Sequence, residues 1–342
     1  MGWKDKKRKI GIVITAIVLL LGFVFFYVRQ QKQSEPISMT GFKLNTVVKV
    51  TIYDSKDETL LSEVMALCDE YEKIFSRTRP DSELYKLNEG TLPQEDGYYI
   101  LSEECAALIE KGLYYSKLSG GAFDITIEPV SSLWDFTSSE KKVPNEQDIS
   151  EKVKLVGYEN VELKGNKIRF KKEGMGIELG AIAKGYIADK MKKFLLSKGV
   201  ESAIIDLGGN VLCIGERTDG EPFRVGIQKP FAERNETLGT TEVRDRSIVS
   251  SGIYERYFEK NGQFYHHILN PQEGYPIDNG LVSVTIISDR SVDGDVLSTT
   301  CFSLGLEKGM ELISGMQDVH AVFITEDGEP HFSEGFEEEI CI

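Results

Sequence analysis

The sequence predicts an α+β fold in which mixed sheets pack against helices, and three features indicate it. The 342 residues are 41% hydrophobic and 10% aromatic, enough to bury the core of one large domain or two ordinary ones. Amphipathic helical patterns, as at residues 57–75, alternate with segments rich in β-branched residues. Several of those segments follow one another directly, as at 202–206 and 211–214. This succession favours α+β over a regular doubly wound sheet.

We expect the elements in the following order. Residues 46–53 (TVVKVTIY) are typical of a strand. Residues 57–75 place apolar side chains at helical spacing with acids between them, which predicts a helix packed on the sheet. Residues 101–118 repeat that pattern more weakly, and the polar stretch 137–160 is expected to be a surface excursion. Further strands are predicted at 161–170, 202–206, 211–214, 223–228, 246–250, 281–288 and 321–325, and further helices at 179–196, 292–305 and 307–314.

The N-terminus predicts a single transmembrane helix ahead of the globular part. Residues 10–28 are 19 residues without a charge, enough to span roughly the 30 Å hydrocarbon core. Five basic side chains lie in the preceding tail (residues 1–9) and two in the linker that follows (residues 29–37), so the tail is expected in the cytoplasm. The alternative, a cleaved signal peptide, would need a small-residue cleavage site, which the bulky end of the run does not offer. Residues 38–342 would form one extracytoplasmic domain.

Composition excludes two classes of function. The chain has 40 Lys and Arg against 55 Asp and Glu, a formal net charge of −15, and seven of the basic residues lie within the first 35 positions. A body that acidic does not bind a nucleic-acid backbone, which needs clustered Lys and Arg. The five cysteines show no CxxC spacing, which excludes a zinc ribbon or a thioredoxin-type motif, and we expect mostly buried free thiols.

Three glycine-containing segments are candidates for holding a ligand. Residues 119–126 (SGGAFDIT) and 206–210 (DLGGN) have paired glycines, which let the backbone approach a ligand and expose its N–H groups. A helix C-cap explains the first segment and a hairpin turn the second without any ligand. Residues 177–186 (IELGAIAKGY) place small residues at a helix start, where N–H groups can hold an anion. Lys184 would lie in the first turn, which favours a phosphate or carboxylate partner.

Two further segments carry ionisable side chains. His266 and His267 are adjacent, and on a strand they face opposite sides, so one is expected to be structural and the other free to act. The alternative is a pair of surface histidines. Asp295 and Thr299 are four residues apart, so on a helix they share a face that suits Mg²⁺, a hard ion with oxygen ligands. The alternative is that Asp295 is the N-cap of that helix, with Thr299 merely beside it.

Seven motifs follow one another along the chain: SGGAFDIT, EPVSSLW, ELGAIAKGY-x-AD, DLGGN, SSG-x-YER-x-F, HHI-x-NP-x-x-G-x-P and GD-x-LST. This series resembles the ApbE family, the FAD:protein FMN transferases, over about residues 42–305. The resemblance implies an ApbE-like, T-fold-type arrangement of mixed sheets and packed helices. It also implies an enzyme that splits FAD, releases AMP and attaches FMN through a phosphoester to a Thr or Ser of a target protein, in a reaction that depends on Mg²⁺.

The resemblance further implies which residues act. The essential histidine of the family falls on His267, where a neutral imidazole would deprotonate or orient the incoming hydroxyl, and Asp295 is expected to take part in catalysis. The positions that hold Mg²⁺ fall on Asp295, Thr299 and the carbonyl oxygen of Ala181, with Ser298 adjacent. The positions that bind FAD fall on Leu44, Thr78, Ala122, Phe123, Asp124, Glu178, Lys184, His267 and Leu269.

The chain departs from the family pattern at three places. Residues 44–46 (LNT) stand in place of Met-Gly-Thr, and residues 77–79 (RTR) in place of Ser-Thr-Tyr, which removes an aromatic ring that could stack on FAD. Glu178 stands where many members carry Asp. These changes concern the detailed contacts to FAD rather than the class of reaction.

Two other functions stay open at this point. One is a flavin-binding protein that stores or delivers FAD, and the other is a Mg²⁺-dependent pyrophosphatase that releases free FMN and AMP. The presence of His267 with Asp295 and Thr299 favours chemistry over storage, and only a transferase leaves FMN covalently on an acceptor. The resemblance points to an acceptor flavoprotein, an extracytoplasmic subunit of a membrane electron-transport system in a bacterium.

Overall fold

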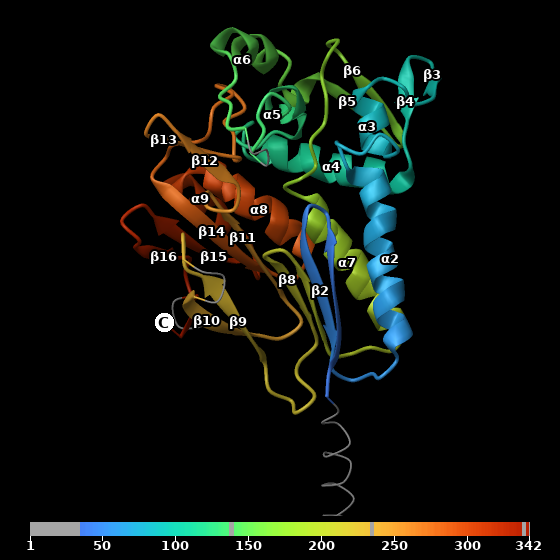
Figure 1. Cartoon of the computed structure of the whole chain (residues 1–342), viewed down its shortest axis with the longest axis vertical. Helices are drawn as coiled ribbons and strands as arrows, with labels where there is room; N and C mark the ends of the chain where they lie inside the picture. The colour runs from blue at the N-terminus through green and yellow to red at the C-terminus, as the bar shows by residue number, and fades with distance from the viewer. Residues whose placement is uncertain (1–34, 137–139, 233–235, 337–339, 342) are drawn as a thin grey trace, which may run out of the picture.

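The computed structural model describes residues 35–136, 140–232, 236–336 and 340–341 (Figure 1). The predicted cytoplasmic tail (1–9) and membrane anchor (10–28) lie outside the described residues. Within the described part, no helix is both long enough and apolar enough to cross a membrane. The first strand begins at Ile37, where the predicted linker ends.

An eight-stranded sheet forms the centre of the molecule, and all of its neighbouring strands are antiparallel. Every residue of its strand Leu281–Ser288 is buried, which is the pattern of a strand covered on both faces. In spatial order the strands are β1 (Ile37–Lys43), β2 (Thr46–Ile52), β7 (Ala203–Leu207), β8 (Asn210–Ile214), β11 (Ser247–Gly252), β14 (Leu281–Ser288), β15 (His320–Thr325) and β16 (Pro330–Phe332).

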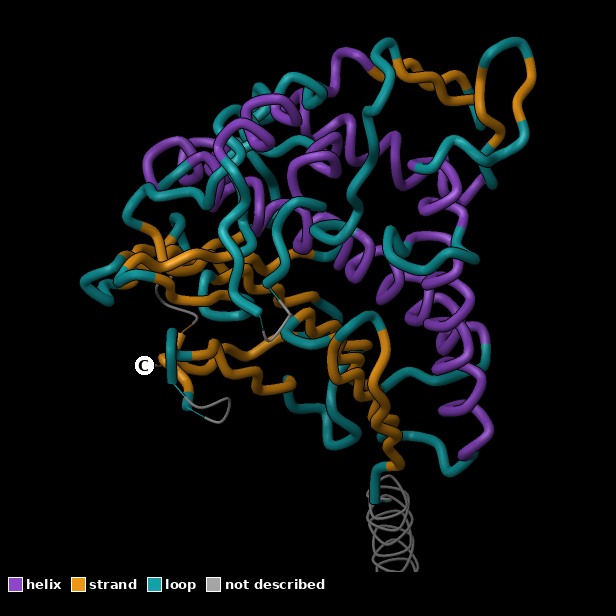
Figure 2. The backbone as a smooth tube through the Cα atoms, turned by 45° about the horizontal axis from the view of Figure 1, so that its top comes forward, coloured by secondary structure: helices purple, strands orange, loops and turns teal. Residues whose placement is uncertain are grey.

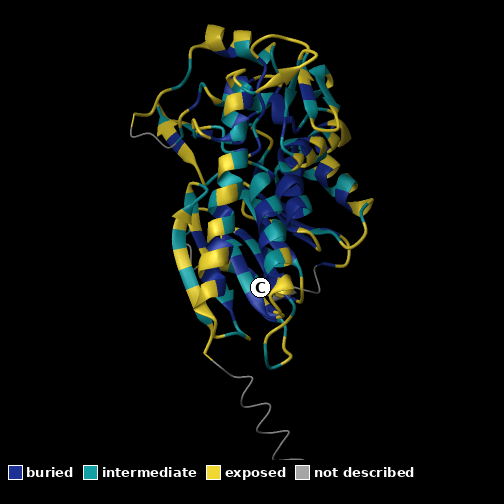
Figure 3. Cartoon of the chain, turned by 90° about the vertical axis from the view of Figure 1, so that its right-hand side faces the viewer, coloured by how far each residue is buried: buried dark blue, intermediate teal, exposed yellow. Residues whose placement is uncertain are grey.

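Helices pack beside this sheet, and Figure 2 shows them gathered along one side of the strands. Asp57 caps the first of them, with its Oδ1 accepting a hydrogen bond from Thr59 N at 3.0 Å, and a buried apolar stripe follows. The helices are α2 (Glu58–Phe75), α4 (Glu103–Leu118), α7 (Ala183–Ser197), α8 (Ser291–Leu304) and α9 (Leu306–Ser314). Their inward faces and the sheet enclose the main hydrophobic core, which Figure 3 shows as the buried interior.

A second apolar cluster lies under a small sheet made of β17 (Ile340–Cys341), β10 (Thr237–Val243) and β9 (Phe223–Gln228). Phe223 from β9 and Ile287 from the central sheet belong to that cluster, so strands as well as helices cover the central sheet.

A third apolar cluster surrounds Trp134, whose Nε1 donates to the carbonyl oxygen of Gly274 at 3.0 Å.

The elements that complete the fold are short: α3 (Glu83–Asn88), α5 (Glu128–Ser131), α6 (Glu146–Val153), the 3-10 turns Ile125–Ile127 and Tyr158–Asn160, the hairpin β12 (Tyr257–Lys260) and β13 (Gln263–His266), and the sheet of β3 (Gln94–Glu95), β4 (Tyr98–Ile100), β6 (Lys167–Phe170) and β5 (Val161–Lys164).

The structure corrects three of the predicted elements. The single strand expected at 161–170 is the hairpin β5–β6, because Gly165 adopts φ 60° and turns the chain. The helix expected from residue 179 begins at Ala183, after a turn. The surface excursion at 137–160 contains the helix α6, whose buried Ile149 packs with Trp134.

Candidate functional site

The N-terminal turns of α7 and α8 meet in the interior, and the predicted residues Lys184 and Asp295 lie in those turns. The backbone N–H of Gly185 in α7 donates to Asp295 Oδ2 in α8 at 2.8 Å. A Cβ atom placed on Gly185 would lie 2.2 Å from the carbonyl oxygen of Ser291 and 2.7 Å from the Cβ of Asp295. Only glycine allows the two helices to approach this closely.

Asp295 is the buried carboxylate of the site, with 3% of its surface exposed. Burial raises its pKa, while the Lys184 charge, the amide of Gly185 and the side chain of Asn210 act in the opposite direction. Because α8 begins at Ser291, Asp295 is its fifth residue. The alternative that Asp295 is the N-cap of its own helix is therefore wrong.

Hydroxyl groups extend this site along α8. Ser298 Oγ donates to the carbonyl oxygen of Asp295 at 2.8 Å. Ser251 of β11 places its Oγ 2.7 Å from Ser298 Oγ and 3.1 Å from Thr299 Oγ1. Sequence reasoning did not single out Ser251, although it lies in one of the seven motifs.

The two histidines have different surroundings, and only His266 lies on a strand, because β13 ends there. His266, the last residue of β13, is buried, and its Nε2 lies 2.9 Å from the carbonyl oxygen of Ile277 while its Nδ1 accepts from Ile268 N at 3.3 Å. Both ring nitrogens are thus used by the backbone, and burial lowers the pKa of His266 to about 4. The alternative of two surface histidines is wrong.

His267 follows the end of β13, and its buried Nδ1 has no hydrogen-bond partner within the described structure. Its pKa is lowered to about 3, mainly by burial and in addition by the charges of Arg256, His266 and Lys184. The ring is therefore neutral at pH 7, and one of its nitrogens makes no hydrogen bond within the described structure.

Lys184 influences both Asp295 and His267 through its charge. It is the second residue of α7 and half-buried, as its predicted first-turn position requires. Among the described residues, no carboxylate oxygen lies within 4 Å of its ammonium group, so the lysine is available to a bound anion.

The glycine segment after α4 is a helix C-cap, as its ligand-free alternative proposed. Gly120 and Gly121 have φ values of 62° and 84°, and their N–H groups donate to carbonyl oxygens of α4. The N–H groups of Ala122 and Phe123 donate to Ser119. The expectation that the paired glycines expose these N–H groups is therefore wrong, because the helix end uses them.

Asp124 has a structural role in the same segment. Its Oδ1 accepts from Thr126 N at 2.8 Å and its Oδ2 from Tyr158 N at 2.9 Å, which connects the segment to the turn at 158–160. Burial raises the pKa of this carboxyl group. A contact from Asp124 to FAD would use its backbone, since its side chain is already bonded.

Glu178 is paired with Arg77, one of the two arginines that replace the family pattern at 77–79. Glu178 Oε1 also accepts from Gly180 N at 3.1 Å, and Arg77 Nη1 donates to Ser132 Oγ at 3.2 Å. Burial raises the pKa of Glu178, opposed mainly by the Arg77 charge. A side chain absent from the predicted set, Arg77, thus lies directly against a predicted one.

The remaining predicted residues lie at different depths. Leu44 is half-buried in the β1–β2 turn with φ 54°, and Thr78 is exposed after α2. Leu269 is buried with the Trp134 cluster, and Ala181 is half-buried in the turn that precedes α7. Chain connectivity brings Ala181 and Lys184 to the α7–α8 meeting point, whereas Thr78 N donates to Ser76 Oγ at the end of α2.

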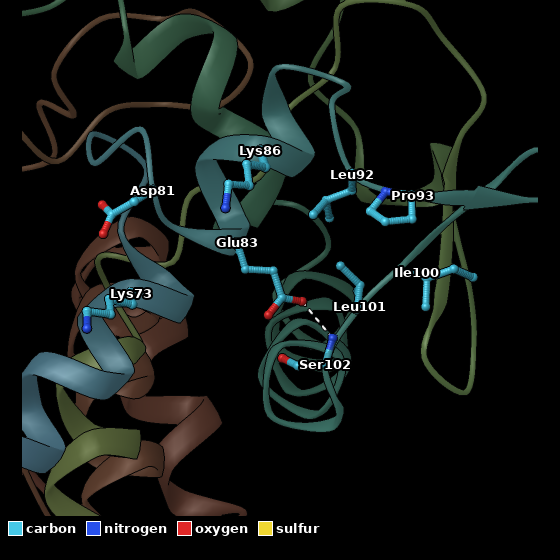
Figure 4. Close-up of a pocket in the computed structure, with 9 residues that line it drawn as sticks. All are labelled: Lys73, Asp81, Glu83, Lys86, Leu92, Pro93, Ile100, Leu101 and Ser102. Carbon is cyan, nitrogen blue, oxygen red and sulfur yellow. Dashed lines mark hydrogen bonds between the residues drawn. The ribbon is translucent and has the colours of Figure 1, made fainter.

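A cavity of about 490 Å³ lies apart from these residues (Figure 4). It is bounded by the end of α2, by α3 and by the start of α4, where Glu83 Oε1 accepts from Ser102 N at 2.6 Å. None of the predicted site residues lines it. We place the candidate site at the α7–α8 meeting point because the buried Asp295 carboxylate lies there and the charge of Lys184, in the first turn of α7, acts on both Asp295 and His267.

The donor set at the meeting point fits Mg²⁺. No cluster of three His, Cys, Asp or Glu side chains occurs among the described residues, so a transition-metal site of that kind is not formed there. The Asp295 carboxylate and the Thr299 hydroxyl are instead hard oxygen donors one helical turn apart, which is the chemistry that Mg²⁺ prefers.

The fold is an α+β arrangement of antiparallel sheets and packed helices, and its candidate site has a buried carboxylate on α8 against the start of α7. The ApbE family model matches residues 44–323, and the chain belongs to the ApbE family. It is 38% identical to the FAD:protein FMN transferase of Klebsiella pneumoniae over 85% of this chain and 89% of that one. It is 32% identical to the enzyme of the same name from Treponema pallidum, with 87% of each chain covered. The crystal structure of the ApbE protein from Thermotoga maritima superposes with a TM-score of 0.80 at 29% identity, covering 90% of this chain and all of that one.

Proposed function

We propose that this protein is a Mg²⁺-dependent FAD:protein FMN transferase. It cleaves the pyrophosphate of FAD, releases AMP and attaches FMN through a phosphoester to a Thr or Ser of an acceptor protein. Membership of the ApbE family supports the flavin transfer. The observation that carries the proposal within this chain is the buried Asp295 at the start of α7, with the charge of Lys184 acting on both Asp295 and His267.

In the proposed reaction the acceptor hydroxyl oxygen forms a bond to the phosphorus on the FMN side. The bond from that phosphorus to the bridging oxygen breaks, and AMP leaves with that oxygen. The hydroxyl proton passes to the imidazole of His267, whose low pKa keeps it neutral beforehand. Lys184 places a positive charge where the pyrophosphate would bind.

Asp295, Thr299 and the carbonyl oxygen of Ala181 would hold Mg²⁺, with Ser298 beside them. When bound, the ion would supply charge to the pyrophosphate oxygens as the leaving group departs. Asp295 contributes by keeping one carboxylate oxygen on the Gly185 amide, which fixes the orientation of the carboxylate. Ser251 holds the Ser298 and Thr299 hydroxyls in place through their shared hydrogen bonds.

We also propose that residues 10–28 anchor the enzyme in a bacterial cell membrane with its catalytic domain outside the cytoplasm. The positive-inside distribution of charge around that run supports this orientation. The acceptor would then be an extracytoplasmic flavoprotein subunit of a membrane electron-transport system. Protease added to cells with a permeable wall should digest the domain, and protection that lasts until the membrane is lysed would show the opposite orientation.

The test of the activity uses the full chain in detergent with FAD, Mg²⁺ and a candidate acceptor subunit. Mass spectrometry of the acceptor should show one added FMN on a Thr or Ser, together with free AMP in solution. Free FMN and AMP with an unmodified acceptor would instead identify a pyrophosphatase. Bound FAD that stays intact would identify a storage protein, and either result rejects the transferase proposal.

A further inference from the structure

The two helices that form the site both lack a cap from their own sequence. The N-cap residue of α7 is Ile182 and that of α8 is Arg290, and neither provides a side-chain hydrogen bond to its helix. A helix start leaves its first N–H groups without partners inside the helix, and buried N–H groups without partners are costly. These N–H groups must therefore be satisfied from elsewhere in the fold.

Some are bonded locally, such as Ala183 N to the carbonyl oxygen of Leu179, and others are satisfied by exchange between the helices. Asp189, in the middle of α7, accepts from Ser291 N at 2.9 Å with its Oδ1 and from Val292 N at 3.1 Å with its Oδ2. In the other direction, Asp295 of α8 accepts from Gly185 N of α7. Each helix thus supplies the carboxylate that caps the other.

This exchange fixes the position of α8 along α7. Both oxygens of Asp189 are used on two successive amides, so a shift of α8 by a single residue would lose both bonds. Ser291 is further held by Asn210, whose Oδ1 accepts from Ser291 Oγ at 2.7 Å. Asp295 and Thr299 follow on the same rigid helix, so their distance from Lys184 and from the turn at Ala181 depends on this start point.

We propose that Asp189 is a positioning residue for the divalent-cation site, acting through the start of α8. The inference rests on the proposed function, since it takes Asp295 and Thr299 as the ligands. Asp189 does not touch the ion. It sets where the ligands stand, in the way that outer-shell partners set the affinity of other metal sites.

The test measures cation binding rather than turnover. Mn²⁺, a paramagnetic substitute for Mg²⁺, is titrated into the full chain in detergent and followed by electron paramagnetic resonance. Asp189→Asn keeps the shape of the side chain but replaces one acceptor oxygen with an NH₂ group. We expect its Mn²⁺ dissociation constant to rise roughly 10- to 100-fold, with the transfer rate recovering at high Mg²⁺.

The matched control is Ser102→Ala, which removes the side-chain cap of α4, where Ser102 Oγ accepts from Cys105 N at 3.2 Å. It should lower Tm as the loss of a helix cap does, and leave the Mn²⁺ dissociation constant unchanged. Asp189→Glu is the second variant, which keeps the charge and lengthens the side chain, and it should also bind Mn²⁺ more weakly if Asp189→Asn fails to fold.

The possible outcomes distinguish an error in the proposed cation site from an error in the proposed role of Asp189. If the unaltered protein binds no Mn²⁺ at all, the cation in the proposed function is wrong. If the unaltered protein binds Mn²⁺ and a folded Asp189 variant binds it equally well despite a lower Tm, Asp189 only stabilises the fold and the positioning role is overturned.

Discussion

Replacing His267 with alanine is expected to remove most FMN transfer while FAD still binds. At pH 7 the ring is neutral in nearly every molecule, because its pKa is lowered to about 3, and its Nδ1 has no partner within the described structure. A positioned acid–base group contributes roughly 10²–10⁴-fold to a rate. That factor corresponds to about 3–5 kcal/mol of activation free energy. FAD affinity should change much less, since Lys184 and the α7–α8 oxygens remain.

The assay is covalent FMN on the acceptor, seen as flavin fluorescence in a denaturing gel, beside a titration of FAD binding. The control variant is His266→Gln, which keeps a donor near the carbonyl oxygen of Ile277. His266 makes two backbone hydrogen bonds, each worth about 1 kcal/mol, so this variant should lose stability and retain transfer.

The pH dependence adds a second check on His267. The profile of kcat/KM reports the free enzyme, so a base with a pKa of about 3 should cause no loss of rate between pH 8 and pH 5. An acid limb centred near pH 6.5 that disappears in His267→Ala would contradict the buried, neutral imidazole. An inactive His266→Gln beside an active His267→Ala would refute the assignment of the two rings altogether.

Three further predictions follow from the same geometry. Asp295→Ala and Thr299→Ala should each abolish the Mg²⁺-dependent rate in a folded protein, and unchanged turnover of Asp295→Ala at limiting Mg²⁺ would reject the ligand assignment. Gly185→Ala should lower the free energy of unfolding by about 1–3 kcal/mol, because the new Cβ would lie 2.2 Å from the carbonyl oxygen of Ser291. The control is Gly315→Ala, whose Cβ would lie 3.6 Å from Leu312 O, and it should be nearly neutral in urea unfolding. Since the folded pKa of His266 (about 4) lies below the unfolded value of about 6.5, its contribution should lower stability by up to ~3 kcal/mol as the pH falls from 6.5 to 4; a urea midpoint that falls equally in His266→Gln would contradict this.

Much of the fold could be predicted because its signals are local. The helix 58–75 has a capping Asp57 and an apolar stripe within one segment, and the strand 281–288 (LVSVTIIS) is rich in β-branched residues. The hairpin at 161–170 was missed because two four-residue strands joined by Gly165 and Asn166 look like one strand when the turn is overlooked. Strands this short contain too few residues to show alternation.

In the candidate site, too, features with a local sequence signal could be predicted, and contacts between distant segments could not. Strand alternation predicted that His266 and His267 differ, but His267 lies beyond the end of β13, so their difference has another cause. The one-turn spacing of Asp295 and Thr299 followed from the helix period. Ser251 could not be assigned, since its partner Thr299 lies 48 residues further along the chain. The same distance problem hid the ion pair of Arg77 with Glu178, which no local pattern indicates.

The exchange of caps between α7 and α8 also bears on when the enzyme becomes active during its own synthesis. The capping partners are 102 residues apart, and helices of 15 and 14 residues are marginal in isolation. Neither helix start is complete until the strands between them, β7 to β14, have formed the sheet that brings the two together. Because Asp295 and Thr299 lie in α8, the proposed cation site could not assemble on a growing chain before that helix has been synthesised.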